Sequence, residues 1–190
     1  MDYCLEYKNL NDKKHIYTKI EYDELINLID SFQTALIYIG GAWCENCQAI
    51  IDIVNKVCKK RGLKQIYNYD PHFTNVFGDE EDLRDCKSLE VKLKYYAIVE
   101  KLGFKSDEYV QDTLIPRIRA PFFAAIKNGC CVGTLSVEYL RDGTVLHKDG
   151  EDEDLTVEFV EGLISLIEPI QNPKKFWLFK LLNLHKKDEE

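Results

Sequence analysis

The feature that most constrains the fold is a pair of cysteines placed between a buried strand and an amphipathic helix. Residues 34–39 form an apolar run that two glycines close. Such a run is typical of a strand covered on both faces, as in the centre of an α/β sheet. From Cys44 to Lys60 the apolar residues lie on one helical face, and Gly62 marks a helix end. The sequence therefore predicts that Cys44 and Cys47 open a helix directly after a central strand.

The elements before and after this pair fit an α/β domain. Residues 15–20 are β-branched and aromatic and predict a short strand, and the stretch that follows to Phe32 has helical spacing behind acidic residues. Another strand is predicted at 64–69, ended by Asp70 and a proline. The predicted order up to this point is β-α-β-α-β.

The middle of the chain predicts helices. Residues 79–103 are charged and carry an apolar stripe at helical spacing, which predicts one long helix or two. The stripe consists of Leu83, Cys86, Leu89, Leu93, Tyr96 and Val99. Residues 104–119 predict only helix fragments and loop.

The last part of the chain predicts a hairpin and a core helix. Asn128-Gly129 is a strong hairpin signal between two apolar segments. The predicted strands are 122–127 and 131–137, with a further edge strand at 144–147. Apolar residues from Phe159 to Ile167 predict the helix, and Pro169 is expected to stop it.

Composition narrows the functional classes. The 190 residues carry a formal net charge of −8, which disfavours nucleic acid as a partner. No apolar run reaches the roughly 18 residues of a membrane span, and the first residues lack the apolar stretch of a secretory signal. Seven unevenly spaced cysteines fit a reducing compartment better than a disulfide framework. We therefore expect a cytoplasmic protein.

A Cys-x-x-Cys pair on the first turn of a helix has a defined chemistry. The first thiol lies over free amide donors and the positive end of the helix, which stabilise its thiolate. The second thiol lies about one turn further in, close enough to resolve a mixed disulfide. We expect Cys44 to attack and Cys47 to release the product.

Several motifs occur together in an order that resembles the thioredoxin-fold oxidoreductases. They are Trp43-Cys44-x-x-Cys47 after an apolar strand, the helix that follows, Ala120-Pro121 opening the next strand, and the Lys127-Asn128-Gly129 turn. The resemblance covers roughly residues 15–70 and 118–168. It implies a thioredoxin-like α/β fold, in which helices flank a central mixed β-sheet.

The resemblance also implies roles for residues outside the cysteine pair. Pro121 would be a cis-proline beside the cysteines, and the backbone of Ala120 would bind an extended peptide. Trp43 would form part of the docking surface. The subfamily stays open, since both Dsb-type dithiol oxidases and bacteriocin-transport accessory proteins share local features with this chain.

Three features depart from the family pattern. Tyr38 stands where many thioredoxins have a buried acid, so proton transfer to Cys47 needs another group or is slower. Glu45 and Asn46 lie between the cysteines, and the Glu45 carboxylate should oppose the thiolate, which favours a reducing pair. A helical insertion is expected at about 76–115, near the end of the domain that carries the cysteines.

The other cysteines have structural explanations. Cys58 lies too far along the helix to exchange with the pair, and Cys130 and Cys131 follow a turn expected at the far end of the sheet. Cys86 is the one candidate for a third reactive thiol, although packing in the core is the favoured explanation. The four histidines, His15, His72, His147 and His185, lack metal-ligand spacing, so we expect no metal site.

The domain is expected to span residues 1–172, and residues 173–190 predict an amphipathic tail helix with basic ends. The tail would dock on the domain or on a second copy, or would bind a partner groove or an anionic membrane surface. The oligomeric state is left open.

Two functional hypotheses follow. The first is a thiol-disulfide oxidoreductase that acts on protein disulfides, takes electrons from a cellular dithiol and needs no bound cofactor. The alternative is a non-catalytic binding or accessory module that keeps the fold and uses the insertion and the tail to hold a partner protein or a membrane complex.

Overall fold

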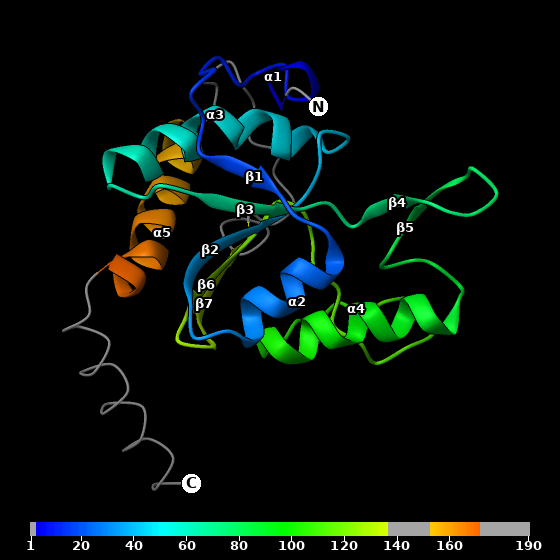
Figure 1. Ribbon diagram of the computed structural model, residues 1–190. Coiled ribbons are helices and arrows are strands. Elements are labelled where there is room, and N and C mark those ends of the chain that lie inside the picture. Colours follow the sequence, from blue (N-terminus) through cyan, green and yellow to red (C-terminus); the bar gives the residue numbers. More distant parts are fainter. Residues whose placement is uncertain (1–2, 137–152, 172–190) are drawn as a thin grey trace, which may run out of the picture.

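The structure is a computed structural model, described here for residues 3–136 and 153–171, and it has a central mixed sheet between two layers of helices (Figure 1). The strand order is β1-β3-β2-β6-β7. The first three are mutually parallel, and β6 and β7 join the sheet antiparallel. Their bounds are β1 Tyr17–Lys19, β2 Thr34–Ile39, β3 Ile66–Tyr69, β6 Phe122–Lys127 and β7 Cys130–Ser136. The predicted α/β class with a mixed, helix-flanked sheet is confirmed.

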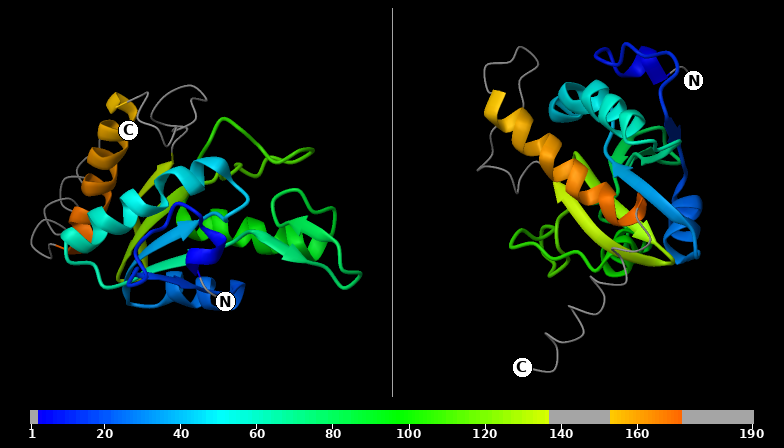
Figure 2. Two further views of the ribbon diagram at one scale, coloured as in Figure 1. Left: turned by 90° about the horizontal axis from the view of Figure 1, so that it is seen from above. Right: turned by 90° about the vertical axis from the view of Figure 1, so that its left-hand side faces the viewer.

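Helices cover both faces of this sheet (Figure 2). The helices α2 (Tyr22–Asp30) and α4 (Leu89–Leu102) lie on one face. The helices α3 (Glu45–Lys60) and α5 (Glu153–Gln171) lie on the other, with the short α1 (Tyr3–Glu6) beside α3.

Side chains of β2 alternate between the two layers, as the pleat of a strand requires. Ala35, Ile37 and Ile39 pack toward α2 and α4. Leu36 and Tyr38 pack toward α3 and α5. All five are buried, so the prediction of a strand covered on both faces is confirmed.

The segment between β3 and β6 contains a hairpin and then α4, so the helix predicted over 79–103 is confirmed only from Leu89 to Leu102. The strands β4 (His72–Thr74) and β5 (Glu80–Asp82) form a separate two-stranded sheet that extends from the end of β3. The side chain of Asn75 accepts hydrogen bonds from the backbone N–H groups of Phe77 and Asp79, which closes the turn. Only at Leu89 does α4 begin.

The predicted apolar stripe is confirmed only in part, because Leu83, Cys86 and Val99 are buried and the other three residues are not. Leu89, Leu93 and Tyr96 are exposed by 72, 59 and 44%. The buried residues are Tyr95, Ile98, Val99 and Leu102. The Tyr95 hydroxyl accepts from the Ile118 N–H and donates to the Pro116 carbonyl, and these two bonds fix which face of α4 points inward.

The last helix differs from its prediction at its end. Pro169 lies inside α5, which continues to Gln171 instead of stopping at the proline. A proline lacks the N–H that would bond to the preceding turn and normally kinks or ends a helix, and α5 extends only two residues beyond it. The Lys127 ammonium donates to the Pro169 carbonyl and so satisfies one of the last carbonyl groups. The strand predicted at 144–147 and the tail helix predicted at 173–190 lie outside the described residues.

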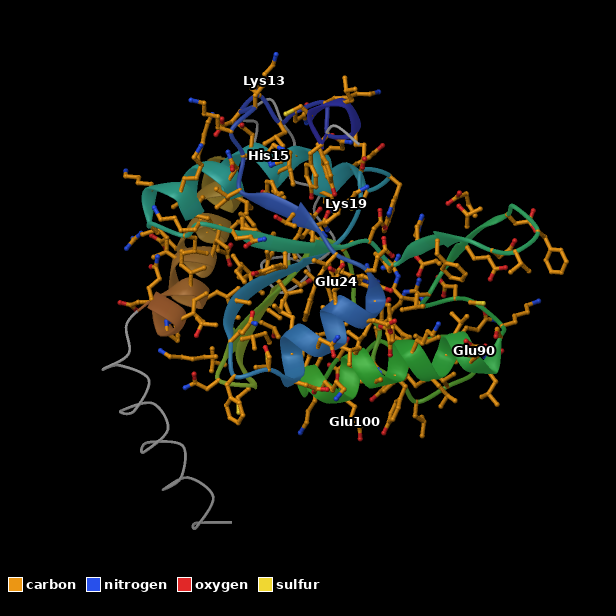
Figure 3. The ribbon with its side chains drawn as sticks, viewed as in Figure 1. Lys13, His15, Lys19, Glu24, Glu90 and Glu100 are labelled. Atoms are coloured by element: carbon orange, nitrogen blue, oxygen red, sulfur yellow. The ribbon has the colours of Figure 1, made fainter. Side chains whose placement is uncertain are left out.

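Charged side chains such as Glu90 and Glu100 on α4 point to the outside (Figure 3). Within residues 3–136 and 153–171, none of the helices combines the length and the apolar character that crossing a bilayer demands.

Candidate functional site

The cysteine pair lies at the start of α3, as predicted. Cys44 is the N-cap residue, and its sulfur accepts a hydrogen bond from the Cys47 backbone N–H at 3.4 Å. Cys44 is half-buried and Cys47 is fully buried. The loop between β2 and α3 is tight because a Cβ atom on Gly40 would lie 2.8 Å from the Cys47 sulfur, and one on Gly41 would overlap Asp70. A side chain at position 40 or 41 would therefore overlap its neighbours, so both positions require glycine.

The two thiols have pKa values shifted in opposite directions. The pKa of Cys44 falls from 9.0 to about 7, because its sulfur accepts hydrogen bonds from the Cys47 side chain and from the backbone of Cys47 and Asn46. The positive charge of Arg84 also lowers this pKa, whereas partial burial opposes the shift. Burial raises the pKa of Cys47 well above its usual range. At neutral pH Cys44 is therefore substantially thiolate and Cys47 is a thiol.

The segment before β6 lies against the cysteine pair. The Ala120-Pro121 peptide bond is cis, as expected from the resemblance. The Cys44 thiol donates to the Ala120 carbonyl oxygen at 3.5 Å. The structure thus brings Cys44, Cys47, Ala120 and Pro121 together, although Ala120 and Cys44 are 76 positions apart in the chain.

Trp43 is partly exposed beside the cysteines and is held by residues near the β4–β5 hairpin. Its indole N–H donates to the Asp70 carboxylate at 2.9 Å. The His72 ring stacks on it with centroids 4.0 Å apart and planes 2° from parallel. The guanidinium carbon of Arg84 lies 5.3 Å from the centroid of the Trp43 ring, within cation–π range.

Arg84 connects the insertion to the body of the domain. It is buried, and its Nε donates to both carboxylate oxygens of Asp82 at 2.8 and 3.0 Å. Its Nη1 donates to the Ile118 carbonyl at 3.0 Å, on the segment that leads to Pro121. His72 Nε2 lies 3.0 Å from the same Asp82 carboxylate. The insertion therefore lies at the cysteine end of the sheet and places a positive charge near Cys44.

Sequence analysis missed this group of Asp70, His72, Asp82 and Arg84. One signal was present, because polar residues that follow parallel strands gather at one edge of a sheet. Asp70 and His72 follow β3, and Cys44 follows β2. Nothing in the local sequence marks Arg84.

Tyr38 is in direct contact with the cysteine pair. It is fully buried, and its hydroxyl lies next to the Cys47 sulfur, since a Cβ atom on Gly40 would be 2.9 Å from the Tyr38 hydroxyl and 2.8 Å from the Cys47 sulfur. The interaction of the Tyr38 hydroxyl with this sulfur lowers the pKa of Cys47. The Tyr7 hydroxyl, also fully buried, lies 3.4 Å from the Tyr38 hydroxyl. Tyr7 belongs to the segment after α1 that sequence analysis left without structure.

The two residues between the cysteines have different surroundings. Glu45 is exposed to solvent and Asn46 is half-buried. The backbone of Asn46 helps to lower the pKa of Cys44, and the opposing effect expected from the Glu45 carboxylate stays a prediction.

The remaining cysteines lie apart from this chemistry. Cys58 is buried, and burial raises its pKa to about 12. The Cys86 thiol is also buried and donates to the Glu81 carboxylate at 2.8 Å. Cys131 has a raised pKa because of burial. Across the part of the chain that the structure describes, no three His, Cys, Asp or Glu side chains are grouped to hold a metal ion.

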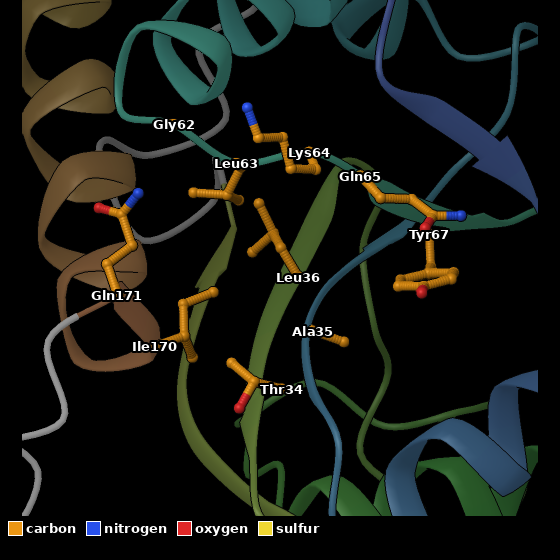
Figure 4. A pocket seen from close by; sticks show the side chains of 10 residues that line it. All are labelled: Thr34, Ala35, Leu36, Gly62, Leu63, Lys64, Gln65, Tyr67, Ile170 and Gln171. Atoms are coloured by element: carbon orange, nitrogen blue, oxygen red, sulfur yellow. The ribbon is translucent and has the colours of Figure 1, made fainter.

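A shallow pocket of about 340 Å³ lies at the other end of the sheet (Figure 4). It is formed by the start of β2, the segment between α3 and β3, and the last turn of α5. Its lining residues are Thr34, Ala35, Leu36, Gly62, Leu63, Lys64, Gln65, Tyr67, Ile170 and Gln171. None of these lining residues is among those that contact Cys44.

Comparison with known proteins adds no further assignment. No family model matches the chain, and no curated protein matches it.

Proposed function

We propose that the protein is a thiol-disulfide oxidoreductase with a thioredoxin-like fold, acting on protein disulfides. The observation that carries the proposal is a pair of thiols with opposite pKa shifts at a helix N-terminus, packed against a cis-proline. The strand order and the position of the proline before β6 support the thioredoxin-like fold. An exposed disulfide in an extended peptide is the substrate class that fits this site.

The reaction balances without a bound cofactor. The Cys44 thiolate attacks one sulfur of the substrate disulfide, which forms a mixed disulfide and expels the other sulfur as a thiolate that takes a proton from water. The Cys47 thiol then loses its proton, attacks the Cys44 sulfur and forms the Cys44–Cys47 disulfide. The second substrate sulfur leaves and takes up that proton. Two electrons pass to the substrate, and a cellular dithiol in the cytoplasm restores the pair.

Substrate alignment would use the backbone beside the proline. An extended peptide pairs with the backbone of Ala120 in the manner of an added strand. This places the peptide beside Cys44, whose sulfur lies 3.5 Å from the Ala120 carbonyl oxygen. Trp43 and the His72 ring stacked on it form one wall of the docking surface.

The reducing direction is supported by the acidity of Cys44. A pKa of about 7 is close to that of a thioredoxin nucleophile and far above the value of about 3.5 in a strong dithiol oxidase. A less stabilised thiolate makes the dithiol form a better electron donor.

The test is a redox titration. The protein is equilibrated in graded dithiol/disulfide buffers, free thiols are trapped with an alkylating mass tag, and the Cys44 and Cys47 peptides are read by mass spectrometry. We expect a midpoint near about −270 mV. Cys44→Ser should abolish turnover of a protein disulfide, and Cys58→Ser is the matched control that should retain it. A midpoint near about −120 to −180 mV would reverse the direction of the reaction.

A second candidate function is a non-catalytic binding module. The observation that favours it is the turn of the β4–β5 hairpin, where Val76 and Phe77 are exposed by 94 and 87%. Apolar side chains that exposed are typical of interaction sites when they cluster. If the Cys44–Cys47 disulfide does not form at any redox potential of the buffer series, this second function replaces the first.

A further inference from the structure

The inference concerns the buried Tyr38 and rests on the proposed function. Cys47 must become a thiolate in the resolving step, and it must leave as a thiolate when the disulfide of the pair is reduced. Its sulfur is fully buried, so water cannot solvate that charge. A buried thiolate needs hydrogen-bond donors from the protein.

Few groups face the Cys47 sulfur. Cys44 contributes a thiol from α3, and the backbone of Gly41 lowers the pKa of Cys47. Tyr38 contributes a hydroxyl from β2, and it too lowers this pKa. Tyr7 and Tyr17 lie in the same core layer, on the N-terminal segment and on β1, but neither is among the main influences on the pKa of Cys47. A carboxylate, an ammonium or an imidazole is not among the main influences on Cys47.

The ring of Tyr38 is held in one orientation. It stacks on Phe123 with centroids 5.1 Å apart and planes 17° from parallel. The side-chain amide of Asn68 donates to the Tyr38 carbonyl at 3.2 Å and to the Gly40 carbonyl at 2.8 Å. The Tyr7 and Tyr38 hydroxyl oxygens lie 3.4 Å apart and share a hydrogen bond. The Tyr38 hydroxyl, which lies beside the Cys47 sulfur, is thus positioned before any reaction begins.

We propose that the Tyr38 hydroxyl is a catalytic group that donates a hydrogen bond to the Cys47 thiolate in the resolving step and in its reverse. No net proton is taken up by the phenol. In the resolving step the proton of Cys47 ends on the departing substrate sulfur, and in the reverse step Cys47 leaves as a thiolate that Tyr38 stabilises. Tyr7 supports the geometry through its own hydroxyl.

The Tyr38 phenol differs chemically from the buried acid that many thioredoxins have at the corresponding position. It is neutral at neutral pH, so it stabilises a thiolate without adding a negative charge beside it. It also does not act as a base near neutral pH, because burial raises the pKa of Tyr38 well above its usual range and the phenolate that could take a proton is not formed. The resolving rate should therefore increase with pH without a plateau near neutrality of the kind that a buried carboxylate would give.

The experiment uses an aromatic disulfide, 5,5′-dithiobis(2-nitrobenzoate), because each step releases a coloured thiolate. The full-length protein carries Cys4→Ser, Cys130→Ser and Cys131→Ser so that only the site reacts quickly. The first release reports attack by Cys44, and the second reports resolution by Cys47. Cys47→Ser identifies the second release by removing it.

Tyr38→Phe should slow the second release about tenfold or more at pH 7, the loss expected when a donor to a charged group is removed. The first release should stay within about twofold, since the hydroxyl does not touch Cys44. Tyr17→Phe is the matched control, because its hydroxyl donates to the Ile51 carbonyl at 2.6 Å and not to Cys47. It should leave both releases unchanged.

A second readout needs no turnover. In a Cys44→Ser background, the pH midpoint for alkylation of Cys47 should be higher with Tyr38→Phe than with Tyr38. If Tyr38→Phe does not fold, Tyr7→Phe should give a smaller slowing of the second release. Resolution at the original rate with an unchanged alkylation midpoint would overturn the role of Tyr38 and leave the oxidoreductase intact. Absence of the second release in the parent protein would instead overturn the proposed function.

Discussion

The face of the sheet under α3 and α5 has a different core from the face under α2 and α4. The first buries several phenols and thiols, namely Tyr3, Tyr7, Tyr17, Tyr38, Cys47 and Cys58. The second is mainly aliphatic, with phenylalanines and two tyrosines among its buried residues. Each polar hydroxyl on the α3 face costs free energy unless it is hydrogen-bonded, so this face is built for more than packing. The comparison supports a division in which one face carries the proposed thiol chemistry and the other mainly supplies stability.

The largest effect should come from the aliphatic face. Ile37 is fully buried there, and Ile37→Ala should lower the free energy of unfolding by about 2–5 kcal/mol. Urea denaturation measures this loss, with Thr34→Ala at the exposed start of the same strand as the control. The alkylation midpoint of Cys44 should stay at about 7 in the folded Ile37→Ala protein. A shift of that midpoint would mean that the two faces are not separable.

A smaller effect should come from the charge that the insertion places beside the site. The thiolate is the reactive form of Cys44, and Arg84 lowers the pKa of Cys44. Arg84→Met should therefore raise that pKa above about 7, so that less thiolate is present at pH 7 and alkylation slows several-fold.

Stopped-flow alkylation between pH 5 and 10 measures this change. Arg84→Lys should restore most of the rate because it keeps the positive charge. Arg117→Gln is the control, since Arg117 pairs with Asp85 in the same insertion through bonds of 2.6 and 2.7 Å. An Arg84→Met protein with the original pH profile would show that the hydrogen bonds at the start of α3 lower the pKa of Cys44 without a contribution from Arg84.

The smallest effect should come from Glu45. Its carboxylate is exposed, so solvent and salt screen its repulsion of the Cys44 thiolate. Glu45→Gln should speed alkylation of Cys44 at pH 7 by less than about twofold at physiological salt, and more at low salt. A decrease in rate would contradict the expected sign.

Much of the fold could be predicted from local patterns. The strand at 34–39, the cysteine helix and the hairpin around Asn128-Gly129 follow from apolar periodicity and from turn chemistry. The insertion could not be predicted in the same way. Its hairpin depends on the side chain of Asn75, and the buried face of α4 depends on the bond from Ile118 to Tyr95, 23 positions away.

The residues of the candidate site also fall into those that local sequence patterns predict and those that they do not. Trp43, Cys44, Cys47, Ala120 and Pro121 carry signals in the sequence and meet in the structure. Arg84 and Tyr7 reach the site only through contacts between distant segments, which no local pattern encodes. The sequence shows Tyr38 as a departure from the buried acid of many thioredoxins. Its position beside Cys47 becomes visible only in the structure.

The tight loop of Gly40 and Gly41 limits how this site can diversify. A methyl group at either position would collide with residues of the proposed site, Tyr38 and Cys47 in one case and Trp43 and Asp70 in the other. Random mutation in this loop should therefore yield inactive proteins and not new specificities. Adaptation to a different substrate would have to draw on the 75–79 turn, where Val76 and Phe77 are exposed. Selection for altered substrates should concentrate its accepted changes there.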